Sequence, residues 1–111
     1  MNPVLLAWPL LIASILAEIA GMLALRYANG FTNLLPTSCA LLGFLASIWL
    51  MSLSLKLKHI ELGITYAVWA ASTTAILTLI GIAFYGEALS QLKLMGMLMV
   101  VTGVVVLNLG V

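Results

Sequence analysis

The sequence predicts an all-α membrane protein with four transmembrane helices that assembles as an antiparallel dimer of eight helices. Three observations support this fold class: an apolar composition, four long apolar runs, and an even split of basic residues between the connections. The chain has 111 residues, of which 65% are hydrophobic and only 6% charged. About a quarter of the residues in a soluble domain are charged. The chain therefore has too few polar groups to cover a globular surface, but it can fill a bilayer.

The four apolar runs cover residues 3–25, 34–55, 62–85 and 94–111. Each is close to the ~20 residues that a helix needs to cross the hydrocarbon core. Helices are expected because an open sheet would leave unpaired backbone groups in lipid. We therefore predict helices at approximately 3–26, 33–55, 62–85 and 91–110, within a single domain over residues 1–111.

The N-terminal run is expected to be retained as a spanning helix. It has no basic segment before it and continues well past the 7–15 apolar residues typical of a signal peptide. Pro9 lies inside this predicted helix and can kink it, although neighbouring groups can satisfy the carbonyl that it leaves free.

The connections contain the expected helix signals. Asn29 and Gly30 form a helix-stop and turn pair. Pro36 then falls in the first turn of the second helix, where a missing amide hydrogen is tolerated. Gly86 is expected to end the third helix, and Ser90 can cap the N-terminus of the fourth.

Basic residues divide evenly between the two sides of the membrane. Lys56 and Lys58 lie on the side of both termini, and Arg26 and Lys93 lie on the other side. The positive-inside rule therefore gives no preferred orientation. Two interpretations stay open: a fixed orientation that this balance leaves unresolved, or dual topology, in which copies insert both ways and pair antiparallel.

Glu18 is the main candidate for a functional residue. A charged group at the centre of a membrane helix costs roughly 2.5–3.5 kcal/mol on insertion scales, and the nearest cation in sequence, Arg26, is two helical turns away. Ser14 and Gly21 share its helix face, and Ser14 is a candidate member of the site because it offers a hydroxyl group one turn back. Gly21 could leave room for a ligand or another helix. The structural alternative is a protonated carboxyl group hydrogen-bonded between helices.

The functional interpretation of Glu18 is a shared proton and cation site. Burial and a second nearby carboxylate both raise the pKa of a carboxyl group. A carboxyl group that titrates near neutral pH can hold a proton or a cation, but not easily both. Such mutually exclusive occupancy is the physical requirement for antiport.

The third predicted helix supplies possible partners for this carboxylate. Tyr66, Trp69 and Thr73 fall on one helix face. Tyr66 offers a hydroxyl group, and both rings offer π faces to a cation. For Tyr66 alone, an aromatic belt residue at the membrane surface is the alternative. Ser47 on the second predicted helix is a weaker candidate.

The fourth predicted helix is expected to form a dimer seam. Gly96 and Gly103 are seven residues apart, and small residues at such spacing allow close helix contact. Four short helices do not easily enclose a polar pathway. Two copies would provide a shared interior for two Glu18 carboxylates.

Other classes of function are disfavoured. Cys39 lies in an apolar run and is interpreted as a packing residue, so neither a disulfide nor a thiolate metal site is expected. His59 and Glu61 lie in a polar connection, as does Glu87. The sequence contains no Ser/His/Asp set and no metal-ligand cluster. We therefore expect no enzyme, no cofactor, no metal and, with a net charge of +1, no nucleic-acid partner.

The chain resembles the small multidrug resistance family, especially its quaternary-ammonium type. The resemblance covers the whole chain and depends on several short motifs taken together. They are residues 17–21 (AEIAG), 29–32 (NGFT) followed by Pro36, 46–49 (ASIW), 63–69 (GITYAVW), 85–87 (YGE), and the pair Gly96 and Gly103.

The resemblance implies an antiparallel homodimer in the bacterial inner membrane that exchanges protons for small organic cations by alternating access. The cations would be quaternary ammonium, polyaromatic or guanidinium-like. By matching position, Glu18 would be the shared proton and substrate carboxylate. Tyr66 and Trp69 would line the site, and Ser47 can hydrogen-bond within it. Gly96 and Gly103 match the family's dimerisation glycines.

Several positions depart from the family pattern. Its Pro-Xaa-Gly before the third helix is residues 61–63 (ELG) here, and its Gly-Xaa-Gly after the tryptophan is residues 71–73 (AST). A threonine of the first helix is Met22, and the usual lysine is Arg26. Thr73 and Thr74 could bend the helix by bonding back to carbonyls. These departures leave a second hypothesis open: a non-exporting partner subunit of a heteromeric pair, or a component of an amino-lipid flippase.

Overall fold

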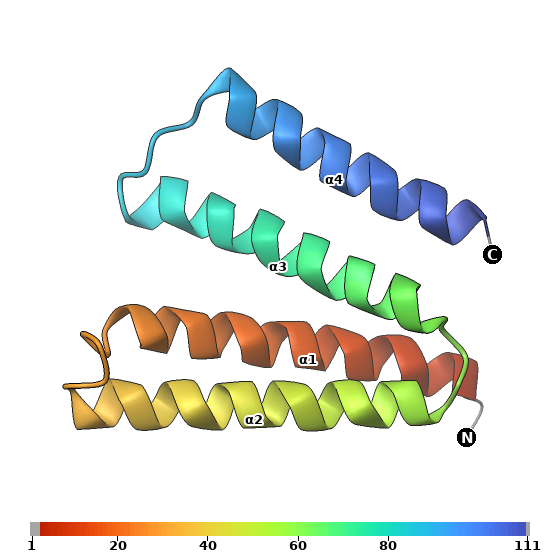
Figure 1. Ribbon diagram of the computed structural model, residues 1–111, viewed down its shortest axis with the longest axis horizontal. Helices are drawn as coiled ribbons and strands as arrows, with labels where there is room; N and C mark the ends of the chain where they lie inside the picture. The colour runs from red at the N-terminus through yellow and green to blue at the C-terminus, as the bar shows by residue number, and fades with distance from the viewer. Residues whose placement is uncertain (1–2, 111) are drawn as a thin grey trace. The chain divides into compact units, whose positions relative to one another are not determined.

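The computed structural model describes residues 3–110, with side chains from Leu5 onward, and contains four α-helices (Figure 1). They are α1 (Pro3–Arg26), α2 (Leu34–Lys56), α3 (Leu62–Phe84) and α4 (Gln91–Leu109). No strand occurs among the described residues. All four helices are long and apolar enough to cross a membrane, as the sequence predicts.

The helix ends differ from the predicted ranges by one residue at most. The second helix begins at Leu34 and ends at Lys56, instead of 33 and 55. The third ends at Phe84 and the fourth at Leu109, one residue earlier than predicted. The first helix continues through Pro9 to Arg26.

The chain divides into two compact units, one ending at Glu61 and the other beginning at Leu62. The first unit is the hairpin of α1 and α2, and the second is the pair of α3 and α4.

The α1–α2 hairpin is held together in a register that repeats every seven residues. The hydroxyl of Ser54 donates to the carbonyl of Ala7 at 2.8 Å. Seven residues further along α1, Ser14 meets Ser47. A further seven residues along, a Cβ atom on Gly21 would lie 3.2 Å from the carbonyl oxygen of Ala40. Small residues at this spacing let two helix backbones approach closely.

A left-handed turn connects α1 to α2. Asn29, Gly30 and Phe31 have φ angles of 51°, 67° and 68°, so the predicted Asn-Gly turn is confirmed. The side-chain amide of Asn33 donates to the carbonyl of Tyr27 at 2.9 Å. Asn and Gly tolerate this conformation more easily than other residues do, which explains why the helix ends here.

The second unit has a looser helix pair. Gly86, with a φ of 67°, turns the chain after α3. The backbone amide of Glu87 donates a hydrogen bond to the carbonyl of Gly81 at 3.1 Å. The Ser90 hydroxyl accepts a hydrogen bond from the amide of Lys93 at 3.1 Å, which confirms the predicted N-cap. Every residue of α4 is at least partly exposed.

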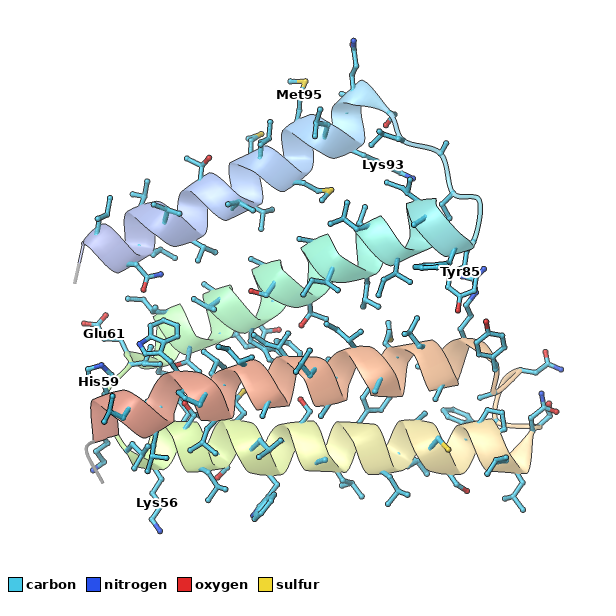
Figure 2. All side chains as sticks on the ribbon, turned by 180° about the vertical axis from the view of Figure 1, so that it is seen from behind. Lys56, His59, Glu61, Tyr85, Lys93 and Met95 are labelled. Carbon is cyan, nitrogen blue, oxygen red and sulfur yellow. The ribbon has the colours of Figure 1, made fainter. Side chains whose placement is uncertain are left out.

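Charged side chains gather at the ends of the helices. Figure 2 shows His59 and Glu61 near each other after the end of α2, Lys56 pointing away from them in the last turn of α2, and Lys93 in the first turn of α4. Glu18 is the only charged residue of the four helices that lies away from a helix end. This distribution suits helices whose ends reach the membrane surface and whose middle parts lie in lipid.

Candidate cation site

Glu18 lies in the second half of α1 and is partly exposed. Among the described residues, its carboxyl group has no hydrogen-bond or ion-pair partner. Gly43 of α2 packs against Ala17 and Gly21, on either side of Glu18 along α1. The acid therefore lies beside a close contact between the two helices, with part of its surface accessible.

Ser14 and Ser47 form a reciprocal pair of hydrogen bonds one turn before Glu18. The Ser14 hydroxyl donates to the carbonyl of Ser47 at 2.8 Å, and the Ser47 hydroxyl donates to the carbonyl of Ser14 at 2.9 Å. The two hydroxyl oxygens are 3.1 Å apart. Both side chains are buried, with exposed fractions of 0% and 1%. The sequence predicts that both serines belong to a cation site. In the structure, their hydroxyl groups are hydrogen-bonded between α1 and α2.

Tyr66 and Trp69 of α3 lie together. Their ring centroids are 5.5 Å apart and their planes are tilted by 39°. Tyr66 is 63% exposed, whereas Trp69 is partly buried. The two rings form one aromatic surface on α3, as their spacing predicts. Contact between these two rings and the Glu18 carboxyl group stays a prediction.

Thr73 follows Trp69 by one turn and is 8% exposed. Among the described residues, neither the Thr73 hydroxyl nor the Trp69 indole nitrogen has a hydrogen-bond partner. The expectation that Thr73 bonds back to its own helix was therefore wrong. Thr78 makes such a bond instead, donating to the carbonyl of Thr74 at 2.7 Å.

Three grooves, two of which involve predicted site residues, lie between α3 and α4 in the described part of the chain. One of these two, of about 580 Å³, is lined by Tyr66, Ala70, Thr74 and Gly103, among others. The other, of about 330 Å³, is lined by Thr78, Lys93 and Gly96, among others. No heavy atom lies within 4 Å of a Cβ atom placed on Gly96 or Gly103. The two glycines therefore leave open space beside α4, and their role in a dimer seam stays a prediction.

Gly43 and Phe44 contribute to the hairpin around Glu18, and the sequence analysis missed both. A Cβ atom on Gly21 would lie 2.9 Å from the Phe44 ring, so the space beside Gly21 is occupied by α2. The signal that could have identified this contact is the matched seven-residue spacing of small residues in the two helices. They are Ala7, Ser14 and Gly21 in α1 and Ala40, Ser47 and Ser54 in α2.

Among the described residues, no three His, Cys, Asp or Glu side chains come together in a group that could hold a metal ion. The two other acids, Glu61 and Glu87, lie in the connections and are exposed. The fold and this acid define a class: multi-pass membrane proteins with one ionisable residue inside a spanning helix, where such residues are typically functional.

The comparisons with known proteins identify the family within this class. The family described as Small Multidrug Resistance protein matches residues 6–100. The chain is 38% identical to the quaternary ammonium compound-resistance protein QacE of Escherichia coli over 102 residues, covering 92% of this chain and 91% of that protein. It is 32% identical to the multidrug transporter EmrE of Escherichia coli over 96 residues, covering 86% of each chain.

A third relative is the nicotine metabolites export pump subunit NepA of Paenarthrobacter nicotinovorans. It is 41% identical over 102 residues, covering 92% of this chain and 86% of that protein. The chain belongs to the small multidrug resistance family. It is a multi-pass protein of the bacterial inner membrane.

Proposed function

We propose that the chain is a proton-coupled antiporter that exports small organic cations by alternating access. Glu18 is the shared binding site for proton and cation. One observation carries the proposal: a single acid, without a partner in the described chain, lies in the middle of an apolar helix and stays partly exposed. Such a group is expensive to place in a membrane and is typically kept for function.

Glu18 can couple the two ions because its occupants exclude each other. An ionised carboxylate attracts an organic cation, and a protonated carboxyl group has no charge with which to do so. Release of the cation on one side and of the proton on the other then follows from competition for one group. No metal or nucleophile is needed for this exchange.

The expected substrates are quaternary ammonium, polyaromatic or guanidinium-like cations. Membership of the family and the names of QacE and EmrE support this class. The tilted rings of Tyr66 and Trp69 give a flat cation a surface for cation–π contact. Trp69 and Thr73 also carry buried donors that can hydrogen-bond to an acceptor such as a carboxylate.

The working form is proposed to be an antiparallel homodimer. The balance of Lys56 and Lys58 against Arg26 and Lys93 permits both orientations. Gly96 and Gly103 leave the surface of α4 open to a second helix. In such a dimer, two copies of Glu18 would share one site.

Transport by purified protein in liposomes tests the proposal. With an outward-directed cation gradient and a weakly buffered interior, wild-type protein should move protons inward as cations leave. The Glu18→Gln variant should insert normally and lose this coupled movement. Glu61→Gln is the matched control, because Glu61 lies in a connection, and it should keep the activity. Coupled exchange by Glu18→Gln at the wild-type rate would exclude the proposal.

A second candidate function is that of a partner subunit that does not export by itself. The relative NepA is named a pump subunit, and residues 71–73 of α3 lack the glycines expected in the family. Crosslinking of the chain expressed alone separates the two candidates. Self-dimers that contain both orientations favour the homodimer, whereas a single orientation without self-dimers favours the partner subunit.

A further inference from the structure

The hydroxyl groups of Ser14 and Ser47 are not available to a ligand, because they are buried and hydrogen-bonded between α1 and α2. Each hydroxyl group has one proton, and both protons are used on the opposite helix, at 2.8 Å and 2.9 Å. The exposed fractions of Ser14 and Ser47 are 0% and 1%. A cation bound at the partly exposed Glu18 therefore cannot reach either hydroxyl oxygen without separating the helices.

The same pair acts directly on the helical turn that carries Glu18. In an α-helix the amide of residue 18 donates to the carbonyl of residue 14. That carbonyl also accepts the hydrogen bond from Ser47. The hydroxyl of Ser47 is therefore bonded to the backbone group that begins the turn ending at Glu18.

We propose that Ser14 and Ser47 are positioning residues that fix the Glu18 turn against α2, and that neither serine is a ligand of the transported cation. The inference rests on the proposed function, because it takes Glu18 as the cation site. Ser14 and Ser47, both predicted from the sequence to contact the substrate, would instead form one fixed contact between α1 and α2. Cation selectivity must then come from other side chains.

Cations with and without N–H groups distinguish positioning from ligation. A guanidinium ion donates hydrogen bonds and a tetraalkylammonium ion has no N–H group, so only the first can use a serine oxygen as an acceptor. If the serines are positioning residues, Ser14→Ala and Ser47→Ala should each lower the binding affinity for both cations by the same factor. We expect about fivefold, on the scale of one lost hydrogen bond. A loss confined to the guanidinium ion would overturn the proposal.

Ser54→Ala is the matched control, because it removes a hydrogen bond of similar length between the same helices. Its partner Ala7 is eleven residues from Glu18, or about 16 Å along the helix. Ser54→Ala should lower thermal stability as much as Ser47→Ala does, without changing the affinity for either cation. An equal loss of affinity in Ser54→Ala would show a general packing effect and contradict positioning at Glu18.

The pH profile of cation binding gives a second readout. No other charged group lies close to Glu18 in the hairpin. On α2 the titratable residues are Lys56, beyond Ser54, and Cys39, which is exposed, and on α1 Arg26 is eight residues away, or about 12 Å. The pH midpoint of cation binding therefore reports on the surroundings of the Glu18 carboxyl group. If the serine pair fixes the Glu18 turn, this midpoint should move in Ser14→Ala and Ser47→Ala and stay unchanged in Ser54→Ala. An unchanged midpoint in both serine variants would count against positioning.

The antiport function of Glu18 and the positioning role of the two serines can be tested separately. If Glu18→Gln bound both cations as tightly as the wild type, the proposed function would fail. If Glu18→Gln lost binding and the serine variants affected only the guanidinium ion, the proposed function would stand and the positioning role would fail.

Discussion

Gly43 of α2 lies so close to Gly21 of α1 that a Cβ atom on Gly43 would be 2.8 Å from the Gly21 Cα atom. The same Cβ atom would be 3.0 Å from the carbonyl oxygen of Ala17. Both neighbours are backbone atoms and cannot rotate away. The packing of the hairpin beside Glu18 therefore depends on the absence of a side chain at Gly43.

Gly43→Ala should destabilise the hairpin. Overpacking a close contact typically costs about 1–3 kcal/mol, which outweighs the gain in helix propensity of about 1 kcal/mol from replacing glycine. Thermal unfolding in detergent measures the change. Gly63→Ala is the control, because no heavy atom lies within 4 Å of its added Cβ atom. Equal unfolding temperatures for the two variants would contradict the close contact.

Thr73→Val should separate stability from transport. The Thr73 hydroxyl is buried without a partner among the described residues, and an unsatisfied buried polar group costs about 1–3 kcal/mol. Valine keeps the shape of the side chain, so the variant should unfold at a higher temperature and exchange cations more slowly. Thr78→Val, which removes a bond to the Thr74 carbonyl, should not gain stability. A Thr73→Val variant with undiminished exchange would remove Thr73 from the cation site.

A covalent link between α1 and α2 at their first contact should leave transport intact. Ser54 and Ala7 are joined by a hydrogen bond of 2.8 Å, so thiols introduced by Ala7→Cys and Ser54→Cys should oxidise to a disulfide. The native Cys39 is replaced by serine in this background. If the hairpin stays closed during the cycle, exchange rates should be the same before and after oxidation. Loss of exchange that returns on reduction would show that α1 and α2 must separate.

Local signals allowed several features to be predicted from the sequence. Asn29 and Gly30 end a helix because of their own backbone preferences, and Ser90 caps α4 through a bond to a residue three positions away. Gly43 could not be identified in this way, because its importance depends on the register of two helices distant in sequence. The pairing of Ser14 with Ser47 depends on the same register. For Thr73, helix spacing puts the residue one turn after Trp69, but whether its hydroxyl finds a hydrogen-bond partner depends on packing that the sequence does not show.

Cation affinity should fall as the pH is lowered through the titration of Glu18. Protonation removes the negative charge that attracts the cation, so affinity is highest where Glu18 is ionised. It should decrease by about tenfold per pH unit on the acidic side for one competing proton. Equilibrium binding of a quaternary ammonium cation in detergent, from mildly acidic to mildly alkaline pH, measures this dependence. Affinity that is constant over the range would contradict competition.

Proton release on cation binding tests the central claim most directly, because it follows both occupants of Glu18 at once. Purified protein in weakly buffered detergent solution, at a pH where Glu18 is partly protonated, is mixed with a saturating quaternary ammonium cation, and the pH change is recorded. Wild-type protein should release protons, and Glu18→Gln should release none. Cation binding by the wild type without proton release, or equal release from Glu18→Gln, would contradict a carboxyl group shared by proton and cation.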